Sequence, residues 1–159
     1  MTKNLLSRLN AEFKELEHEL KNVLPQEIHK AASLGDLSEN AEYEAALERQ
    51  RLLQSKYRSL KSRINEIAQI DLSRIPKDKI GYGSIIELYD LDEEKEVTYQ
   101  LVMPEDADAG KGRISVGSPI GKALLTKNEG DEVTISIPSG KKNYEILGVT
   151  VYHQTSQDL

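Results

Sequence analysis

The sequence predicts an α+β protein, in which a long antiparallel α-helical coiled-coil hairpin precedes a small antiparallel β domain with one short helix. Three observations lead to this fold class. Apolar residues recur with a heptad spacing in two segments of residues 1–75, a Gly35-containing turn separates those segments, and the apolar period changes to two after residue 80. We therefore expect a hairpin domain over residues 1–75 and a β domain over residues 80–153.

The first heptad segment has apolar residues separated by alternating steps of four and three. They are Leu9, Phe13, Leu16, Leu20 and Val23. Pro25 follows, and an internal proline removes one helical hydrogen bond and crowds the turn before it. We expect a kink near Val23–Pro25, with the helix resuming through Ile28 and Ala31. The alternative is two separate helices, with Pro25 at the first position of the second.

The turn and the second helix follow. Gly35 is expected to cap the first segment because glycine adopts the left-handed conformation most easily. Asp36 and Glu39 have the spacing of a capping box, which predicts that the second helix runs from Ser38 to Ala68. Its seam is regular: Tyr43, Ala46, Gln50, Leu53, Tyr57, Leu60, Ile64 and Ile67. The short connection makes the two helices antiparallel and places residues 35–40 at the tip of a projecting hairpin.

A run of basic residues without an intervening acid lies on the second helix after Glu48. Its members are Arg49, Arg51, Lys56, Arg58, Lys61 and Arg63. One interpretation is a solvated face whose cations pair with acids of the first helix. The other is a strip that contacts the backbone of RNA or DNA, for which Arg49, Arg51 and Lys56 are the candidates nearest the tip.

The second half of the chain alternates apolar and polar residues, as half-buried strands do. We expect strands over 84–89, 97–102, 113–116, 132–137 and 143–151, all in one antiparallel sheet. Asp90–Glu94 forms an acidic turn, and Ser118 and Pro119 open a short helix that ends at Leu125. Residues 70–79 are expected to be a linker, and His153–Leu159 a frayed tail.

Composition excludes several function classes. With no cysteine among 159 residues, the chain has no disulfide and no thiolate metal site. Residues 1–75 balance 12 basic against 12 acidic residues, whereas residues 76–159 carry 9 and 15, so the whole net charge of −6 arises there. An acidic chain is a poor general ligand for nucleic acid. Without a signal-like or membrane-spanning apolar stretch, we expect a cytoplasmic protein with no membrane partner.

The sequence shows no self-contained catalytic site. Its three histidines, His18, His29 and His153, are scattered, and it has no phosphate-binding or dinucleotide-binding glycine loop. We therefore expect no small-molecule substrate and no enzyme that acts alone.

The tip acids are the remaining candidate. Asp36 and Glu39 are three residues apart at a helix start, so their carboxylates can point the same way. Two carboxylates suit Mg²⁺ but are too few to hold it tightly, so the ion would be bound only where a partner completes the shell. The alternative is a helix cap with favourable charge placement, worth about 1 kcal/mol.

Three segments carry a resemblance to a known family. Gly35-Asp36-Leu37-Ser38-Glu39-Asn40-Ala41-Glu42-Tyr43 closely resembles the tip signature of bacterial Gre-family transcription elongation factors of the GreA type. The stretch from Ile114 to Leu125 resembles the family's ISxxSPIGxALL segment, and Gly130–Val133 its GDxV turn. The resemblance covers essentially the whole chain.

The resemblance implies a fold and a mechanism. The β domain would be FKBP-like and would dock at the rim of the secondary channel of bacterial RNA polymerase, while the hairpin enters that channel. Asp36 and Glu39 would help to position Mg²⁺ shared with the polymerase, and an attacking water, so that the polymerase cleaves the nascent RNA 3′ end in backtracked complexes. Asn40 and Tyr43 would support the tip. The chain would thus stimulate cleavage in trans, without a tightly bound cofactor.

Two alternatives stay open at this point. A Gre-like regulator could occupy the channel and inhibit the polymerase without cleavage, although the intact Asp-Leu-Ser-Glu-Asn tip argues against it. A folding helper with prolyl isomerase activity would need an aromatic-lined cleft, and the β domain has no Trp or Phe.

The chain departs from the family pattern beside the tip. The family's basic residues there are replaced by Ala32, Ser33, Leu34 and Leu47, which predicts weaker engagement of long extruded RNA.

Overall fold

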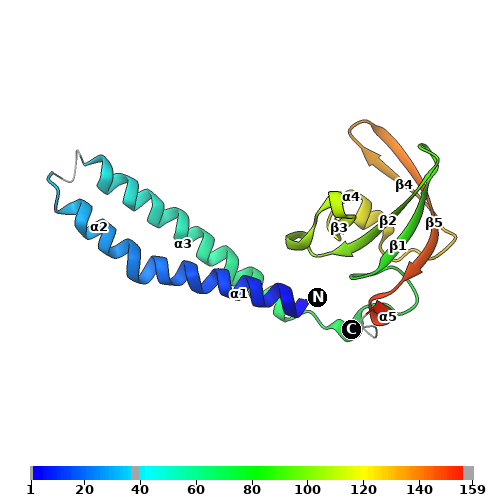
Figure 1. The fold of residues 1–159 in the computed structure, drawn as a ribbon, viewed down its shortest axis with the longest axis horizontal. Coiled ribbons are helices and arrows are strands. Elements are labelled where there is room, and N and C mark those ends of the chain that lie inside the picture. The colour runs from blue at the N-terminus through cyan, green and yellow to red at the C-terminus, as the bar shows by residue number, and fades with distance from the viewer. Residues whose placement is uncertain (1, 37–39, 156–159) are drawn as a thin grey trace. The chain divides into compact units, whose positions relative to one another are not determined.

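The computed structural model describes residues 2–36 and 40–155 and divides the chain into two compact units. The first, Met1–Ile70, is called the hairpin unit, and the second, Asp71–Leu159, the sheet unit. The helical and β parts follow one another along the chain as an α+β protein requires (Figure 1). No helix within the described ranges is both long and apolar enough to cross a bilayer.

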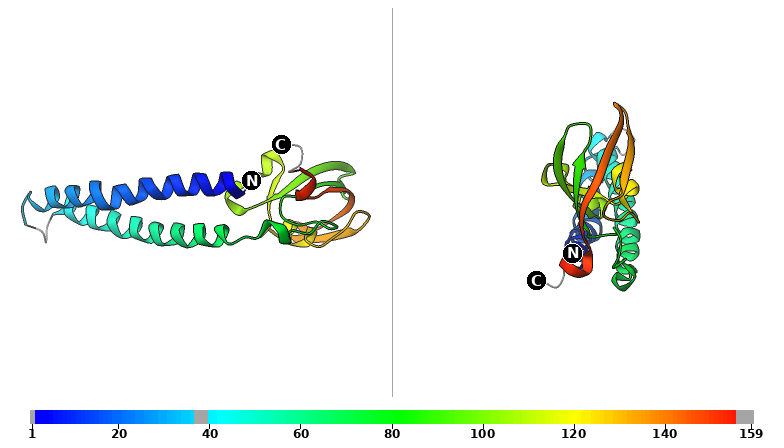
Figure 2. Two further views of the ribbon diagram at one scale, coloured as in Figure 1. Left: turned by 90° about the horizontal axis from the view of Figure 1, so that it is seen from below. Right: turned by 90° about the vertical axis from the view of Figure 1, so that its right-hand side faces the viewer.

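The hairpin unit is a pair of antiparallel helical arms. The first arm contains α1 (Thr2–His18), a π-helical turn η1 (Glu19–Val23) and α2 (Leu24–Ala32), and the second is α3 (Ala41–Ala68). Figures 1 and 2 show the two arms side by side along their length. All eight seam positions expected on the second helix are buried or half-buried, so its register is confirmed. Phe13 and Tyr57 stack across the pair with ring centroids 4.7 Å apart.

The seam of the first arm differs from the expected one at Val23. Its side chain is 37% exposed, whereas that of Leu24 is completely buried. The reason is the π-helical turn, in which the Leu24 N–H bonds to the Glu19 carbonyl five residues earlier and one extra residue shifts the register. Val23 and Leu24 keep right-handed helical dihedral angles, so the first arm stays helical through the π-helical turn, and Pro25 lies in the first turn of α2, as the two-helix alternative expected.

This shifted register makes a stability prediction. Leu24→Ala should lower the free energy of unfolding of the hairpin unit by about 2–5 kcal/mol, because it leaves a cavity at a fully buried position. Val23→Ala, one residue away, should change it by less than about 1 kcal/mol. Urea titration followed by helical circular dichroism at 222 nm measures both. Equal losses for the two variants would contradict the assigned register.

The sheet unit contains one five-stranded sheet in the order β3-β2-β1-β5-β4. Its strands are β1 (Ile85–Asp90), β2 (Lys95–Val102), β3 (Arg113–Ser115), β4 (Glu132–Ile137) and β5 (Gly140–Thr150). All neighbouring pairs are antiparallel except β2 and β3, which are parallel. The expected all-antiparallel sheet is therefore wrong at one edge, where two short 3-10 turns, η3 (Pro104–Asp106) and η4 (Ala109–Lys111), return the chain to the start of β3.

One helix covers the apolar face of the sheet. This helix, α4 (Pro119–Leu124), begins at the Ser118 cap, whose hydroxyl oxygen accepts from the Gly121 N–H at 3.1 Å. Its fully buried Leu124 joins the core formed by the inward-facing residues of β1, β2, β4 and β5. The core has no Phe or Trp, so aliphatic side chains supply most of its packing.

The two ends of the sheet unit are more ordered than the sequence indicated. A short helix, α5 (Tyr152–Thr155), includes His153, whose Nε2 lies 2.9 Å from the carbonyl oxygen of Ile75. Ile75 itself is buried, and a short 3-10 turn, η2 (Leu72–Arg74), precedes it. The expected frayed tail is thus wrong for His153–Thr155, which belong to α5, and much of the expected linker packs within the sheet unit.

The acidic turn after β1 is organised by a buried carboxylate. Asp90 is only 1% exposed, and its oxygens accept from the backbone N–H groups of Asp92 and Glu93 at 3.0 Å and from Lys142 Nζ at 2.9 Å. The Glu93 N–H and the Lys142 ammonium hold the pKa of Asp90 below its ordinary value. The hydrogen bonds from Lys142 Nζ to the Asp90 and Glu93 carboxylates raise the pKa of Lys142.

Acid should therefore weaken the sheet unit through Asp90. Because its pKa is lower in the folded state, its stabilising contribution is complete above the unfolded value of 3.8 and is lost as the pH falls through the folded pKa. We expect Asp90→Asn to be less stable than the parent chain at pH 7, with the gap narrowing below pH 3.8. Denaturant midpoints at a series of pH values measure this gap. A gap independent of pH would contradict the role of the charge.

Candidate functional site at the hairpin tip

The first arm ends one turn before the tip acids. Ser33 is the C-terminal cap of α2, and its N–H bonds to the carbonyls of His29 and Lys30 at 3.1 and 3.2 Å. The expected cap at Gly35 is therefore wrong by two residues. Gly35 instead lies in the connection with a φ of +146°, a conformation that favours glycine.

The second arm starts later than the acidic spacing predicted. Asn40, with extended dihedral angles, is the N-terminal cap of α3, and its side-chain oxygen accepts from the Tyr43 N–H at 3.1 Å. The expected capping box, with Asp36 as the cap and Glu39 as its partner, is therefore wrong, because Asp36 lies four residues before the true cap. Asp36 is exposed and lies in the connection that precedes α3.

The sequence-based candidates fall into two hollows at the tip. Asp36 and Asn40 line the first, together with Leu34, Gly35, Ala41 and Glu42. Tyr43 is half-buried and lines the second, together with Leu47 and Arg51. The structure therefore places Asp36, Asn40 and Glu42 around one site, while Glu39, the other expected metal ligand, lies outside the described residues.

Glu42 is a tip acid that the sequence reasoning did not select. It lies in the first turn of α3 and faces the same hollow as Asp36. Its position two residues after Asn40 would have indicated this, had the cap been assigned correctly. Within the described ranges, no group of three or more His, Asp or Glu side chains is arranged to hold a metal ion.

Two of the three basic candidates pair with the first arm. Arg49 contacts Glu19 and bonds to Glu27 Oε2 at 3.0 Å, and Lys56 Nζ lies 3.0 Å from Glu12 Oε1. Arg51 bonds instead to Glu48 on its own helix, with its side chain 72% exposed. Arg49 and Lys56 thus belong to a solvated face whose cations pair with acids of the first arm. Arg51 is the candidate most open to an outside ligand.

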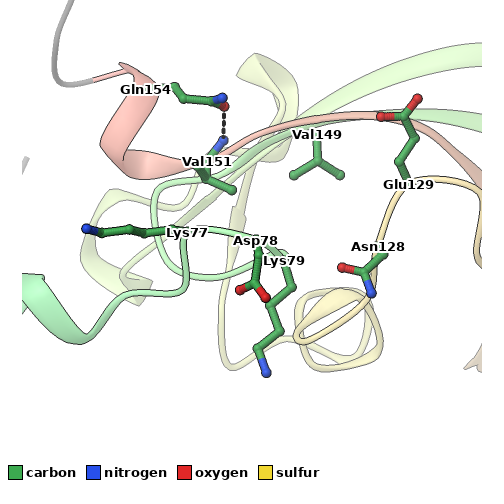
Figure 3. Close-up of a pocket in the computed structure, with 8 residues that line it drawn as sticks. All are labelled: Lys77, Asp78, Lys79, Asn128, Glu129, Val149, Val151 and Gln154. Atoms are coloured by element: carbon green, nitrogen blue, oxygen red, sulfur yellow. Dashed lines mark hydrogen bonds between the residues drawn. The ribbon is translucent and has the colours of Figure 1, made fainter.

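The sheet unit contains a separate hollow, shown in Figure 3. Lysines and acids from the 77–79 segment and the 128–129 loop line it, and Val149 and Val151 contribute apolar surface. The side-chain oxygen of Gln154 accepts from the Val151 N–H at 3.1 Å, so this side chain bonds to the backbone at the start of its own helix, α5. No histidine lies among the lining residues, and opposite charges alternate along its wall, so we take the tip as the candidate site.

Comparison with known proteins decides the family. Residues 1–70 match the N-terminal domain model of transcription elongation factors, and residues 75–151 match the GreA/GreB C-terminal domain model. The chain is 41% identical over 149 residues to transcription elongation factor GreA of Rhodospirillum rubrum, covering 94% of this chain and 95% of that one. The chain belongs to the GreA/GreB family of transcription elongation factors. It is also 42% identical over 143 residues to GreA of Nitratidesulfovibrio vulgaris, covering 86% and 88%.

Among solved structures, the Gre chain is similar to GreA factor homolog 1 of Thermus thermophilus. The two are 23% identical, the match covers 91% of this chain and 94% of that chain, and the TM-score is 0.41. The family assignment rests on the sequence matches, which confirm the resemblance drawn from the tip and from the segment around α4.

Proposed function

We propose that this Gre factor enters the secondary channel of bacterial RNA polymerase and stimulates the polymerase's own cleavage of the nascent RNA 3′ end in backtracked complexes. Family membership supports a role in transcription elongation. The observation that carries the cleavage role is the exposed Asp36 carboxylate, which lines one hollow together with the Asn40 cap of α3 and Glu42.

The tip residues would act as an incomplete cation site. Asp36 and Glu39 would hold Mg²⁺ together with oxygens of the polymerase, and the ion would activate water for phosphodiester hydrolysis. Glu42 adds negative charge at the same hollow. The chain would supply these groups in trans and would not itself be the nuclease.

The rest of the molecule would place the tip. The sheet unit would dock at the channel rim, and Arg51 would be the basic candidate most open to RNA phosphates, since its side chain is 72% exposed. Arg49 and Lys56 would reach RNA only by giving up their bonds to acids of the first arm. This distribution supports a modest grip on extruded RNA.

The test uses a stalled, backtracked polymerase whose RNA carries a 3′ label. Adding the full chain with Mg²⁺ should release labelled 3′ fragments much faster than Mg²⁺ alone. Inhibition of elongation without cleavage would instead support the alternative of a channel-occupying regulator. A chain that neither binds nor affects the polymerase would overturn both proposals.

A further inference from the structure

Asn40 joins the two arms of the hairpin directly. Its side-chain nitrogen donates to the carbonyl oxygen of Ala31 on α2 at 2.5 Å, while its side-chain oxygen accepts from the Tyr43 N–H on α3 at 3.1 Å. The amide orientation is determined by these partners, because a backbone N–H can only donate and a carbonyl can only accept. Reversing the amide would place oxygen against oxygen.

The bond to Ala31 closes the connection that carries the tip acids. Ala31 is buried in the seam, and its carbonyl also accepts from the Leu34 N–H at 3.2 Å. Asn40 is half-buried, and its own carbonyl accepts from the Glu44 N–H at 3.1 Å. Both ends of the 32–39 segment are thus tied to helical backbone by one side chain.

We propose that Asn40 is a positioning residue for the tip, holding the end of α2 at a fixed distance from the start of α3 so that Asp36 faces its target. The proposal rests on the proposed cleavage function. A helix cap alone would require only an acceptor, which serine or aspartate supplies equally well. The second bond requires a donor that reaches across the hairpin, and among good capping residues only asparagine has one.

The chemistry of the side chain allows the two bonds to be separated. Asn40→Ser and Asn40→Asp both keep an oxygen for the Tyr43 N–H, but neither can make the bond to Ala31: serine is too short, and an ionised aspartate has no donor. Asn40→Ala removes both bonds. If Asn40 is only a helix cap, the cleavage rates of Asn40→Ser and Asn40→Asp should equal that of the parent chain. If Asn40 positions the tip, both rates should be as low as that of Asn40→Ala.

The first measurement is cleavage by the full chain in the backtracked complex, titrated with factor and with Mg²⁺. We expect Asn40→Ser to lower the maximal cleavage rate by about 10- to 100-fold, the range that small misplacements of reacting groups produce. The half-saturating factor concentration should stay unchanged, and the Mg²⁺ concentration for half-maximal rate should rise. Parent-like rates for both serine and aspartate variants would overturn the proposal.

A second measurement needs no polymerase. The chain has no cysteine, so Leu34→Cys and Glu44→Cys introduce two unique spin-label sites on either side of the tip. We expect a narrow distance distribution in the parent chain and a broader one in Asn40→Ser, with unchanged helical circular dichroism. Identical distributions would overturn the proposal. If Asp36→Asn retains full cleavage, the proposed function fails instead, and the distance measurement still decides whether Asn40 fixes the tip.

Discussion

Replacing Asp36 with asparagine should abolish factor-stimulated RNA cleavage, lowering its rate by about 100-fold or more, while leaving the fold intact. Asparagine is nearly isosteric with aspartate but carries no charge, so it is a poor ligand for Mg²⁺. Because Asp36 is exposed and is not the cap of α3, the substitution should change the free energy of unfolding by less than about 0.5 kcal/mol. Glu39→Gln should have the same effect on cleavage.

The measurement combines cleavage of 3′-labelled RNA with competition for polymerase binding. Glu44→Gln is the matched control, since Glu44 lies in the first turn of α3 but lines the second hollow with Tyr43, not the one that Asp36 faces. It removes the same charge and should retain nearly full cleavage. Stimulation that survives in the double variant Asp36→Asn, Glu39→Gln would contradict a cation site at the tip. An equal loss of cleavage in Glu44→Gln would mean that the net charge of the tip, and not a cation site, causes the effect.

The hairpin was predictable from the sequence wherever the heptad period was uninterrupted. On α3 each seam residue is buried or half-buried as its spacing indicates, because 3.5-residue periodicity maps directly onto one face of a helix. On the first arm the same periodicity was wrong at Val23, which is exposed, while Leu24 takes the buried position. A π-helical turn is a hydrogen-bonding choice of the backbone, and the sequence signal for it was only Pro25, which also fits a kink or a helix start.

The helix caps at the tip could not be predicted from local residue preferences. Asp36, Asn40 and Gly35 all have residue types that favour helix ends, so local preference could not choose among them. The choice depends on a contact between arms, the bond from Asn40 to the Ala31 carbonyl, which no local pattern contains. The parallel pairing of β3 has a similar origin, since alternation predicts a strand but not its direction.

Gly121→Ala is expected to be the most destabilising single-methyl change in the sheet unit. A Cβ at this position would lie 2.1 Å from the carbonyl oxygen of Ser115 and 3.1 Å from the hydroxyl of Ser118. The first contact is with backbone at the end of β3, so a rotamer change cannot relieve it. Either β3 or α4 must shift, and that would disturb the packing of the fully buried Leu124. We expect a loss of at least about 3 kcal/mol in the free energy of unfolding.

Gly117→Ala is the control for this prediction, because it adds the same methyl group four residues earlier in the same connection. There the nearest atom is the Ser115 hydroxyl at 3.6 Å, an ordinary contact, so the change should be less than about 1 kcal/mol. Amide hydrogen exchange in β2 and β5 measures the stability of the sheet unit without interference from the hairpin unit. Equal protection in the two variants would mean that α4 can move away from β3 at little cost. The glycine of the Ser-Pro-Ile-Gly segment would then need an explanation other than close packing.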